Sequence, residues 1–165
     1  MKKLWSKYSL GISRIPVLLT MVMIYWFSAQ NGAASGNLSG NLTRGLLGLF
    51  LDLEAMEPAA LERLLYTAGT VIRKLGHFTE FAILGFFLQL HIRQVGKRCP
   101  IRGEVLLAWG AGIAYAISDE LHQGFVGGRH PAVTDVLIDS CGVLAGIGLL
   151  LLLMRLVLKK SRAAE

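Results

Sequence analysis

The sequence predicts an all-α, multi-pass membrane protein: a four-transmembrane-helix bundle with an amphipathic helix between the first and second spans. The composition, four apolar stretches and the distribution of basic residues predict this fold class. Of the 165 residues, 53% are hydrophobic and only 17% are charged, whereas a soluble domain usually carries about 25% charged residues. The length fits one domain, which we expect to cover residues 1–165.

Four apolar stretches define the predicted spans, at about residues 15–29, 75–95, 105–121 and 136–158. A helix that crosses a bilayer needs roughly 20 mainly apolar residues. The fourth stretch meets this requirement easily, and the second and third meet it if polar residues are tolerated at one end. The first stretch is short and also fits a cleaved signal peptide. Three later spans favour a retained helix instead.

The positions of the basic residues predict the orientation of the chain. Twelve of the 17 Lys and Arg residues lie in three groups at one end of the spans: Lys2, Lys3, Lys7 and Arg14; Arg93, Lys97, Arg98 and Arg102; and Arg155, Lys159, Lys160 and Arg162. The positive-inside rule therefore places both termini in the cytoplasm and residues 30–74 and 122–134 outside. The net charge of +6 thus reports topology, and we expect membrane lipids and no nucleic acid as partners.

The segment between the first two spans is predicted to lie outside the bilayer. Residues 30–41 are rich in Gly, Ser and Asn, which indicates a loop, and residues 42–51 are apolar but too short to cross. Residues 58–73 begin with proline and carry apolar residues at helical spacing, which predicts an amphipathic helix. We therefore expect an outer-surface segment over about 42–73, which lies on the membrane or covers the bundle as a lid.

Polar residues gather at the outer ends of three predicted spans. The groups are Lys74, His77 and Glu80 in the second, Asp119, Glu120 and Gln123 in the third, and Asp135 and Asp139 in the fourth. Ionisable groups at membrane depth normally face the bundle interior or a water-filled cavity. Because each group contains spacings of three or four residues, members of a group share a helix face. We expect one buried polar cluster near the outer leaflet.

The fourth span carries two carboxylates and two glycines on one stripe, Asp135, Asp139, Gly142 and Gly146. Such a glycine pair lets another helix approach closely. We therefore expect the same contact to deliver both carboxylates to the neighbouring helix.

The end of the third span and the following loop supply further candidates. Asp119 and Glu120 are adjacent, so both cannot point inward from one helix, and we favour Asp119 on the face of Gln123. Arg129 lies on a short glycine-rich loop. It can grip a phosphate or carboxylate bidentately, and a salt bridge to the acids of the cluster is the alternative.

Three motifs and the end of the first span carry a family resemblance. They are Lys74-x-x-His77-Phe78-x-Glu80-Phe81-x-x-x-Gly85, Asp119-Glu120-x-x-Gln123-x-Phe125-x-x-x-Arg129, Asp135-Val136-x-x-Asp139-x-x-Gly142, and Phe27-Ser28-Ala29-Gln30. Together they resemble the signatures of the VanZ-like family over roughly residues 25–142. The resemblance implies a bacterial cytoplasmic (inner) membrane protein of the cell envelope. The family's namesake is associated with resistance to teicoplanin, a lipoglycopeptide that acts at the outer cell surface, so antibiotic resistance is an implied role. The resemblance implies no particular reaction.

The residues support a site with two kinds of role. The predicted catalytic residues are His77, Glu80, Asp119 and Asp139. The predicted substrate-binding residues are Lys74, Glu120, Gln123, Arg129 and Asp135. In one interpretation the protein is an enzyme that acts on an anionic lipid-linked or amphipathic molecule at the outer leaflet, with carboxylates as acid or base. A divalent metal is a further option, because imidazole and carboxylate ligands suit such ions.

Two other interpretations stay open. A non-catalytic binder or small transporter would shield or move the same kind of molecule, and a transporter of this size would need a homodimer. A purely structural polar cluster would only hold the bundle together. The spans become apolar inward of the polar groups, which favours a site on one side over a path across the membrane.

Overall fold

The computed structural model describes residues 2–30, 32–95, 99–129 and 131–162, and these residues form five helices and no strand. The helices are α1 (Lys2–Ser28), α2 (Gly32–Leu47), α3 (Pro58–Val95), α4 (Ile101–Gln123) and α5 (Val133–Arg162). The predicted all-α class is confirmed.

Two helices are long and apolar enough to cross a membrane, α3 and the Val133–Lys160 part of α5. Only 22% of the apolar window of α3 and 28% of that of α5 are buried in the protein, unlike the core helix of a soluble domain. The apolar part of α1 is shorter, Ser13–Ser28, and the acidic residues of α4 limit its apolar run. Four spans therefore stay a prediction.

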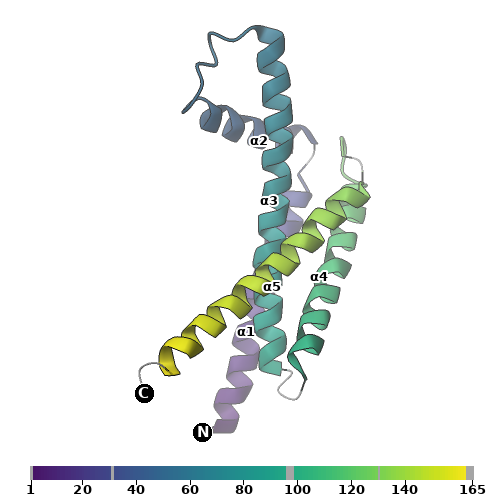
Figure 1. Ribbon diagram of the computed structural model, residues 1–165. Helices are drawn as coiled ribbons and strands as arrows, with labels where there is room; N and C mark the ends of the chain where they lie inside the picture. The colour runs from purple at the N-terminus through teal and green to yellow at the C-terminus, as the bar shows by residue number, and fades with distance from the viewer. Residues whose placement is uncertain (1, 31, 96–98, 130, 163–165) are drawn as a thin grey trace.

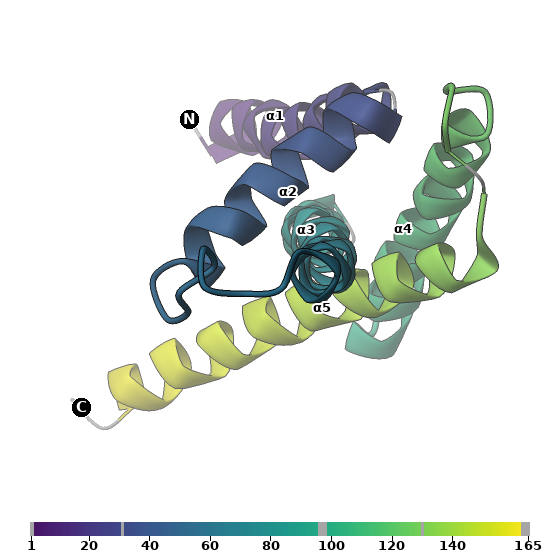
Figure 2. The ribbon, with the colours of Figure 1, turned by 90° about the horizontal axis from the view of Figure 1, so that it is seen from above.

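Helix α3 is the centre of the arrangement. Seen from above it stands end-on, with α1, α4 and α5 around it and α2 lying across its upper part (Figure 2). Helix α5 crosses α3 diagonally, and the start of α1, the start of α4 and the end of α5 lie toward the same end of the molecule (Figure 1). The opposite ends of α1, α4 and α5 lie at a similar height beside α3 (Figure 1).

Glycines set the contact between α3 and α5. A Cβ atom built on Gly146 would lie 1.8 Å from the Ala82 carbonyl oxygen, and one built on Gly142 would lie 2.4 Å from that of Phe78. No larger residue fits at such distances, so the predicted small-residue stripe is confirmed as a helix contact. Asp139 lies one turn before Gly142 and is thereby held against α3.

The loop predicted over residues 30–41 is wrong, because these residues belong largely to α2. Glycine, serine and asparagine lower helix propensity, but packing against another helix can outweigh this effect. Thr43 of α2 is fully buried, and its hydroxyl lies 3.6 Å from the position of a Cβ atom on Gly69 of α3. Because Gly69 has no side chain, α2 can approach α3 closely at this point. The contact stabilises a helix whose amino-acid composition is unfavourable for helix formation.

The predicted separation between a surface helix at 58–73 and a span at 75–95 is also wrong, because both belong to α3. Arg73 and Lys74 lie at the junction, and both are good helix formers that do not end a helix. The segment 58–73 therefore continues the axis of the second predicted span, and α2 packs on it (Figure 1).

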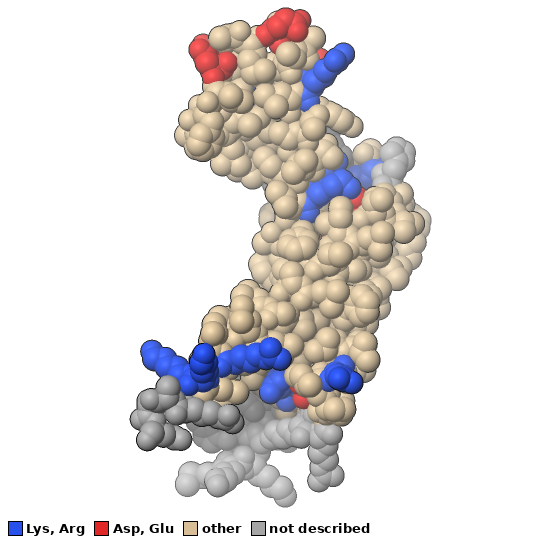
Figure 3. Space-filling model, in the orientation of Figure 1, with Lys and Arg blue, Asp and Glu red and all other residues tan. Residues whose placement is uncertain are grey.

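The surface of the helices is largely apolar. Side chains such as Leu19, Val22, Leu106 and Leu152 are more than half exposed. In Figure 3 an uncharged band separates basic side chains at the lower end of the molecule from charged side chains in its upper part. Exposed apolar surface of this extent is typical of contact with lipid or with a partner.

Candidate functional site

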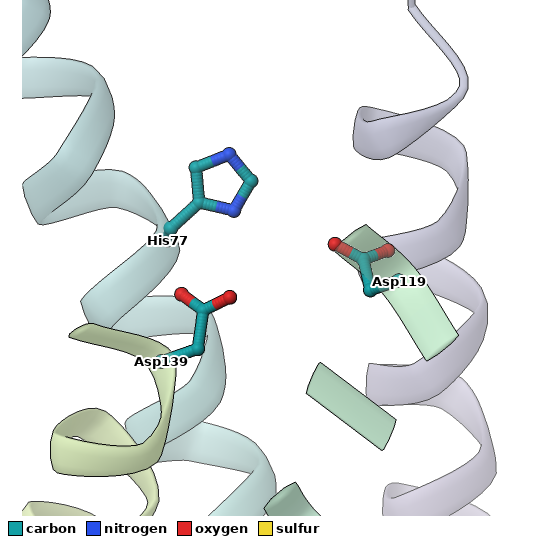
Figure 4. Close-up of side chains that lie close together, drawn as sticks. All are labelled: His77, Asp119 and Asp139. Carbon is teal, nitrogen blue, oxygen red and sulfur yellow. The ribbon is translucent and has the colours of Figure 1, made fainter. Parts of the chain in front are cut away.

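Three helices bring acidic and imidazole side chains together. His77 of α3, Asp119 of α4 and Asp139 of α5 each offer a ligand atom, and these atoms all lie within 4.8 Å of one another. Figure 4 shows the three side chains around one common space. Asp119 is 3% exposed and Asp139 is 1% exposed. The structure thus brings together three of the four residues predicted as catalytic.

Hydrogen bonds orient the Asp119 carboxylate. Ser28 Oγ donates to Asp119 Oδ2 at 2.7 Å, and Gln123 Nε2 donates to the same oxygen at 2.8 Å and to Ser28 Oγ at 2.9 Å. Gln123, predicted to bind substrate, therefore supports Asp119 here. Ser28 was not among the residues predicted for the site, although it lies in the motif at the end of the first span.

The Glu120 side chain points away from that of Asp119, because adjacent residues of a helix do not share a face. Its Oε1 accepts a hydrogen bond from the backbone N–H of Ala132 at 2.6 Å, and the residue is buried. Glu120 therefore holds the loop between α4 and α5, the loop that carries Arg129.

Lys74 and Asp135, both predicted to bind substrate, pair with each other. Lys74 Nζ donates to Asp135 Oδ1, and both side chains are about one third exposed. The ion pair links α3 to the first turn of α5. Their predicted role toward a substrate stays a prediction.

A cleft of about 150 Å³ opens beside the cluster and is lined by residues of α1, α2, α3 and the loop before α5. Its charged or ionisable lining residues are Arg73, His77, Glu80 and Arg129, and its apolar lining residues are Phe27, Leu42 and Ile72. Glu80, the fourth predicted catalytic residue, thus lies in the cleft. His77 belongs to both the cleft and the cluster.

Two arginines, Arg73 and Arg129, line the cleft together with the acid Glu80. Among the residues that the structure describes, neither Arg73 nor Arg129 forms an ion pair within 4.0 Å. Burial lowers the pKa of the Arg129 guanidinium below its usual range, and the nearby positive charge of Arg73 adds to this effect, while Asp119 and Glu120 oppose it. Two like charges held near one cleft are suited to an anionic group.

Arg73 was missed as a site residue in the sequence. It precedes His77 by four residues, a spacing that places both on one helix face. The assumed helix break before residue 75 hid this relation.

Fold and site define a class: an all-helical protein with an apolar outer surface and a buried polar cluster where its helices meet. The family model described as VanZ/LLP1 matches residues 15–155. The chain belongs to the VanZ/LLP1 family, and the predicted VanZ-like resemblance is confirmed. Family membership and the two long apolar helices indicate a membrane protein. Comparison with curated proteins and with solved structures gives no match.

Proposed function

We propose that this protein binds an anionic amphiphilic molecule at the outer face of the bacterial inner membrane and acts on it in the cleft beside His77. The observation that carries the proposal is the lining of the cleft, in which two arginines that form no ion pair among the described residues lie near apolar side chains. Guanidinium groups bind phosphate and carboxylate oxygens bidentately. The fitting ligands are a lipid-linked molecule of the cell envelope and an amphiphilic lipoglycopeptide antibiotic.

Ionisable groups next to the arginines support chemistry on the bound molecule. His77 and Glu80 line the cleft, and Asp119 and Asp139 lie directly behind His77. Imidazole and carboxyl groups transfer protons to and from a reacting group that lies within hydrogen-bond reach. This arrangement favours an enzyme over a passive binder.

A purely structural cluster is the weaker alternative. Polar groups that serve only to join helices are normally satisfied by hydrogen bonds. Here Asp119 Oδ1 and Asp139 Oδ1 are buried without a hydrogen-bond partner among the described residues. Because these two acids come from different helices and converge with His77, they favour a site that meets a ligand.

The proposed membrane arrangement has α1, α3, α4 and α5 as crossing helices. At 1.5 Å per residue, His77 lies about 27 Å from the end of α3 at Val95, and Asp119 lies about 26 Å from Arg102 near the start of α4. The hydrocarbon core is about 30 Å thick, so the site lies near one boundary of it. Basic side chains gather at the opposite end (Figure 3), which favours a cytoplasmic position for that end and an outer position for the site.

Cysteine labelling tests this orientation. In a chain with Cys99→Ser and Cys141→Ser, Phe50→Cys adds a thiol at a position that is 84% exposed, in the segment between α2 and α3. We expect this thiol to react with a membrane-impermeant maleimide on intact cells. Lys160→Cys, near the end of α5, is expected to react only after permeabilisation. The reverse pattern would contradict the orientation.

Titration with a simple amphiphile tests the binding proposal. The protein in zwitterionic nanodiscs is expected to bind an alkyl phosphate more tightly than an alkyl alcohol of the same chain length. Arg129→Ala should weaken phosphate binding roughly 10- to 100-fold, because hydrogen bonds to charged groups contribute about 1.5–3 kcal/mol and about 1.4 kcal/mol equals a factor of ten.

Arg63→Ala is the matched control for this titration. Arg63 is an exposed residue of α3 and does not line the cleft, so its removal should change the affinity by no more than about twofold. Equal losses of phosphate affinity in Arg63→Ala and Arg129→Ala would mean that Arg129 acts only through general electrostatics. That result would contradict the binding proposal.

A further inference from the structure

The cluster of His77, Asp119 and Asp139 contains buried polar atoms that the protein does not satisfy. His77 Nδ1, Asp119 Oδ1 and Asp139 Oδ1 have no hydrogen-bond partner among the described residues. An unsatisfied buried polar atom costs about 1–3 kcal/mol, and more when the group is charged. Other buried atoms, such as those of Gln89 and Trp109, also lack a partner among the described residues. The three atoms of the cluster differ because their side chains come from three helices and face one space (Figure 4), which favours a ligand that they share.

The surroundings of Asp119 resemble the outer shell of a metal site. Metal-binding carboxylates and histidines are usually held in place by hydrogen bonds from neighbouring groups. Ser28 Oγ and Gln123 Nε2 both donate to Asp119 Oδ2. The hydrogen bonds fix the carboxylate and leave Oδ1 free to bind a ligand.

The spacing of the three side chains fits one metal ion. Their ligand atoms lie within 4.8 Å of one another. In a tetrahedral site with bonds of about 2.0–2.1 Å, ligand atoms lie about 3.4 Å apart. Adjustments of about 1 Å, shared by three side chains, therefore suffice to close the site around an ion.

We infer that His77, Asp119 and Asp139 bind one divalent metal ion of the zinc or manganese class. One imidazole with two carboxylates favours such ions over Ca²⁺ and Mg²⁺, which prefer oxygen ligands alone. Three protein ligands leave a coordination position open, as in catalytic zinc sites. Since His77 also lines the cleft, the ion lies next to the proposed binding place of the amphiphile. The inference does not depend on that ligand.

Zinc titration of the purified full-length chain, after removal of metals with a chelator, tests the site. We expect one Zn²⁺ per chain in the wild type. Asp119→Asn and Asp139→Asn should each weaken binding at least about tenfold, as loss of even a supporting group does in known sites. Glu104→Gln is the matched control: this buried carboxylate lies near the opposite end of α4 from Asp119 and pairs with Arg93, so zinc affinity should stay within about threefold of wild type.

A second measurement locates the ion by the appearance of a new absorption band and does not rely on a loss of affinity. His77→Cys places a thiolate among the ligands, and addition of Co²⁺ should give a sulfur-to-cobalt charge-transfer band that wild type and Glu104→Gln lack. Zn²⁺ should also raise the unfolding temperature of wild type, because an ion that binds the folded state stabilises it, and should not raise that of Asp139→Asn.

Three results would overturn the inference. They are a wild-type chain that binds neither Zn²⁺ nor Mn²⁺ stoichiometrically, unchanged zinc affinity in Asp139→Asn, and a folded His77→Cys chain without the cobalt band. None of them bears on the alkyl phosphate titration, because Arg129 is not part of the cluster. A failure of the metal site and a failure of the amphiphile proposal are therefore distinguishable.

Discussion

Replacing Gly146 with alanine is expected to destabilise the protein by about 1–3 kcal/mol, the usual range for an extra methyl group in a packed contact. The new Cβ atom would lie 1.8 Å from the Ala82 carbonyl oxygen and 2.8 Å from the Phe86 backbone nitrogen. Both neighbours are backbone atoms of α3, so no side chain can turn away to make room. The two helices must separate, and the contact that holds Asp139 near His77 loosens with them.

Gly148→Ala is the control for this prediction. Gly148 lies half a turn further along α5, and a Cβ atom there meets nothing within 4 Å. Alanine in an open helical position is more stable than glycine by roughly 0.5–1 kcal/mol, so the two variants should change stability in opposite directions. Unfolding by denaturing detergent in mixed micelles measures both. Equal shifts in the two variants would show that the close contact of α3 and α5 has little energetic weight.

The polar cluster was predictable from the sequence because its signal is local. Ionisable residues are costly in apolar helices, and the spacing of His77, Asp119 and Asp139 within their motifs puts each on a defined helix face. The glycines at 142 and 146 indicated which face of α5 meets another helix. Helix periodicity and the cost of placing ionisable groups in a membrane were therefore enough to predict a polar cluster that contains these three side chains. The conformations of the loops were not needed for this prediction.

The region between residues 30 and 74 was not predictable in the same way. Helix α2 is rich in glycine, serine and asparagine, which lower helix propensity. Its burial of Thr43 against α3 is a tertiary contact that leaves no local pattern in the sequence. Helix α3 is continuous because no helix-breaking residue lies at Arg73 and Lys74. In the sequence, however, two adjacent charged residues at a membrane boundary resemble the end of a membrane-spanning helix. The hydrogen bond from Ser28 to Asp119 depends on the packing of α1 beside α4, which the local sequence pattern does not reveal.

Removal of both guanidinium groups of the cleft is expected to have the largest effect on ligand binding. Arg73 comes from α3 and Arg129 from the loop before α5, and both line the same cleft. If each contributes a charge-assisted contact of about 1.5–3 kcal/mol, the double variant Arg73→Ala/Arg129→Ala should lose roughly 100-fold or more in affinity for an anionic amphiphile. Neither residue is fully buried or ion-paired among the described residues, so the fold should survive the change.

Native mass spectrometry of the protein released from its own membranes tests the central claim most directly. The account predicts that an anionic lipid, such as a phospholipid or a polyprenyl phosphate, accompanies the wild type and Arg63→Ala and is lost from Arg73→Ala/Arg129→Ala. A double variant that unfolds at the wild-type temperature and still carries the same lipid would contradict it. A folded wild-type chain that carries no anionic amphiphile, and takes up none when it is supplied, would contradict it equally.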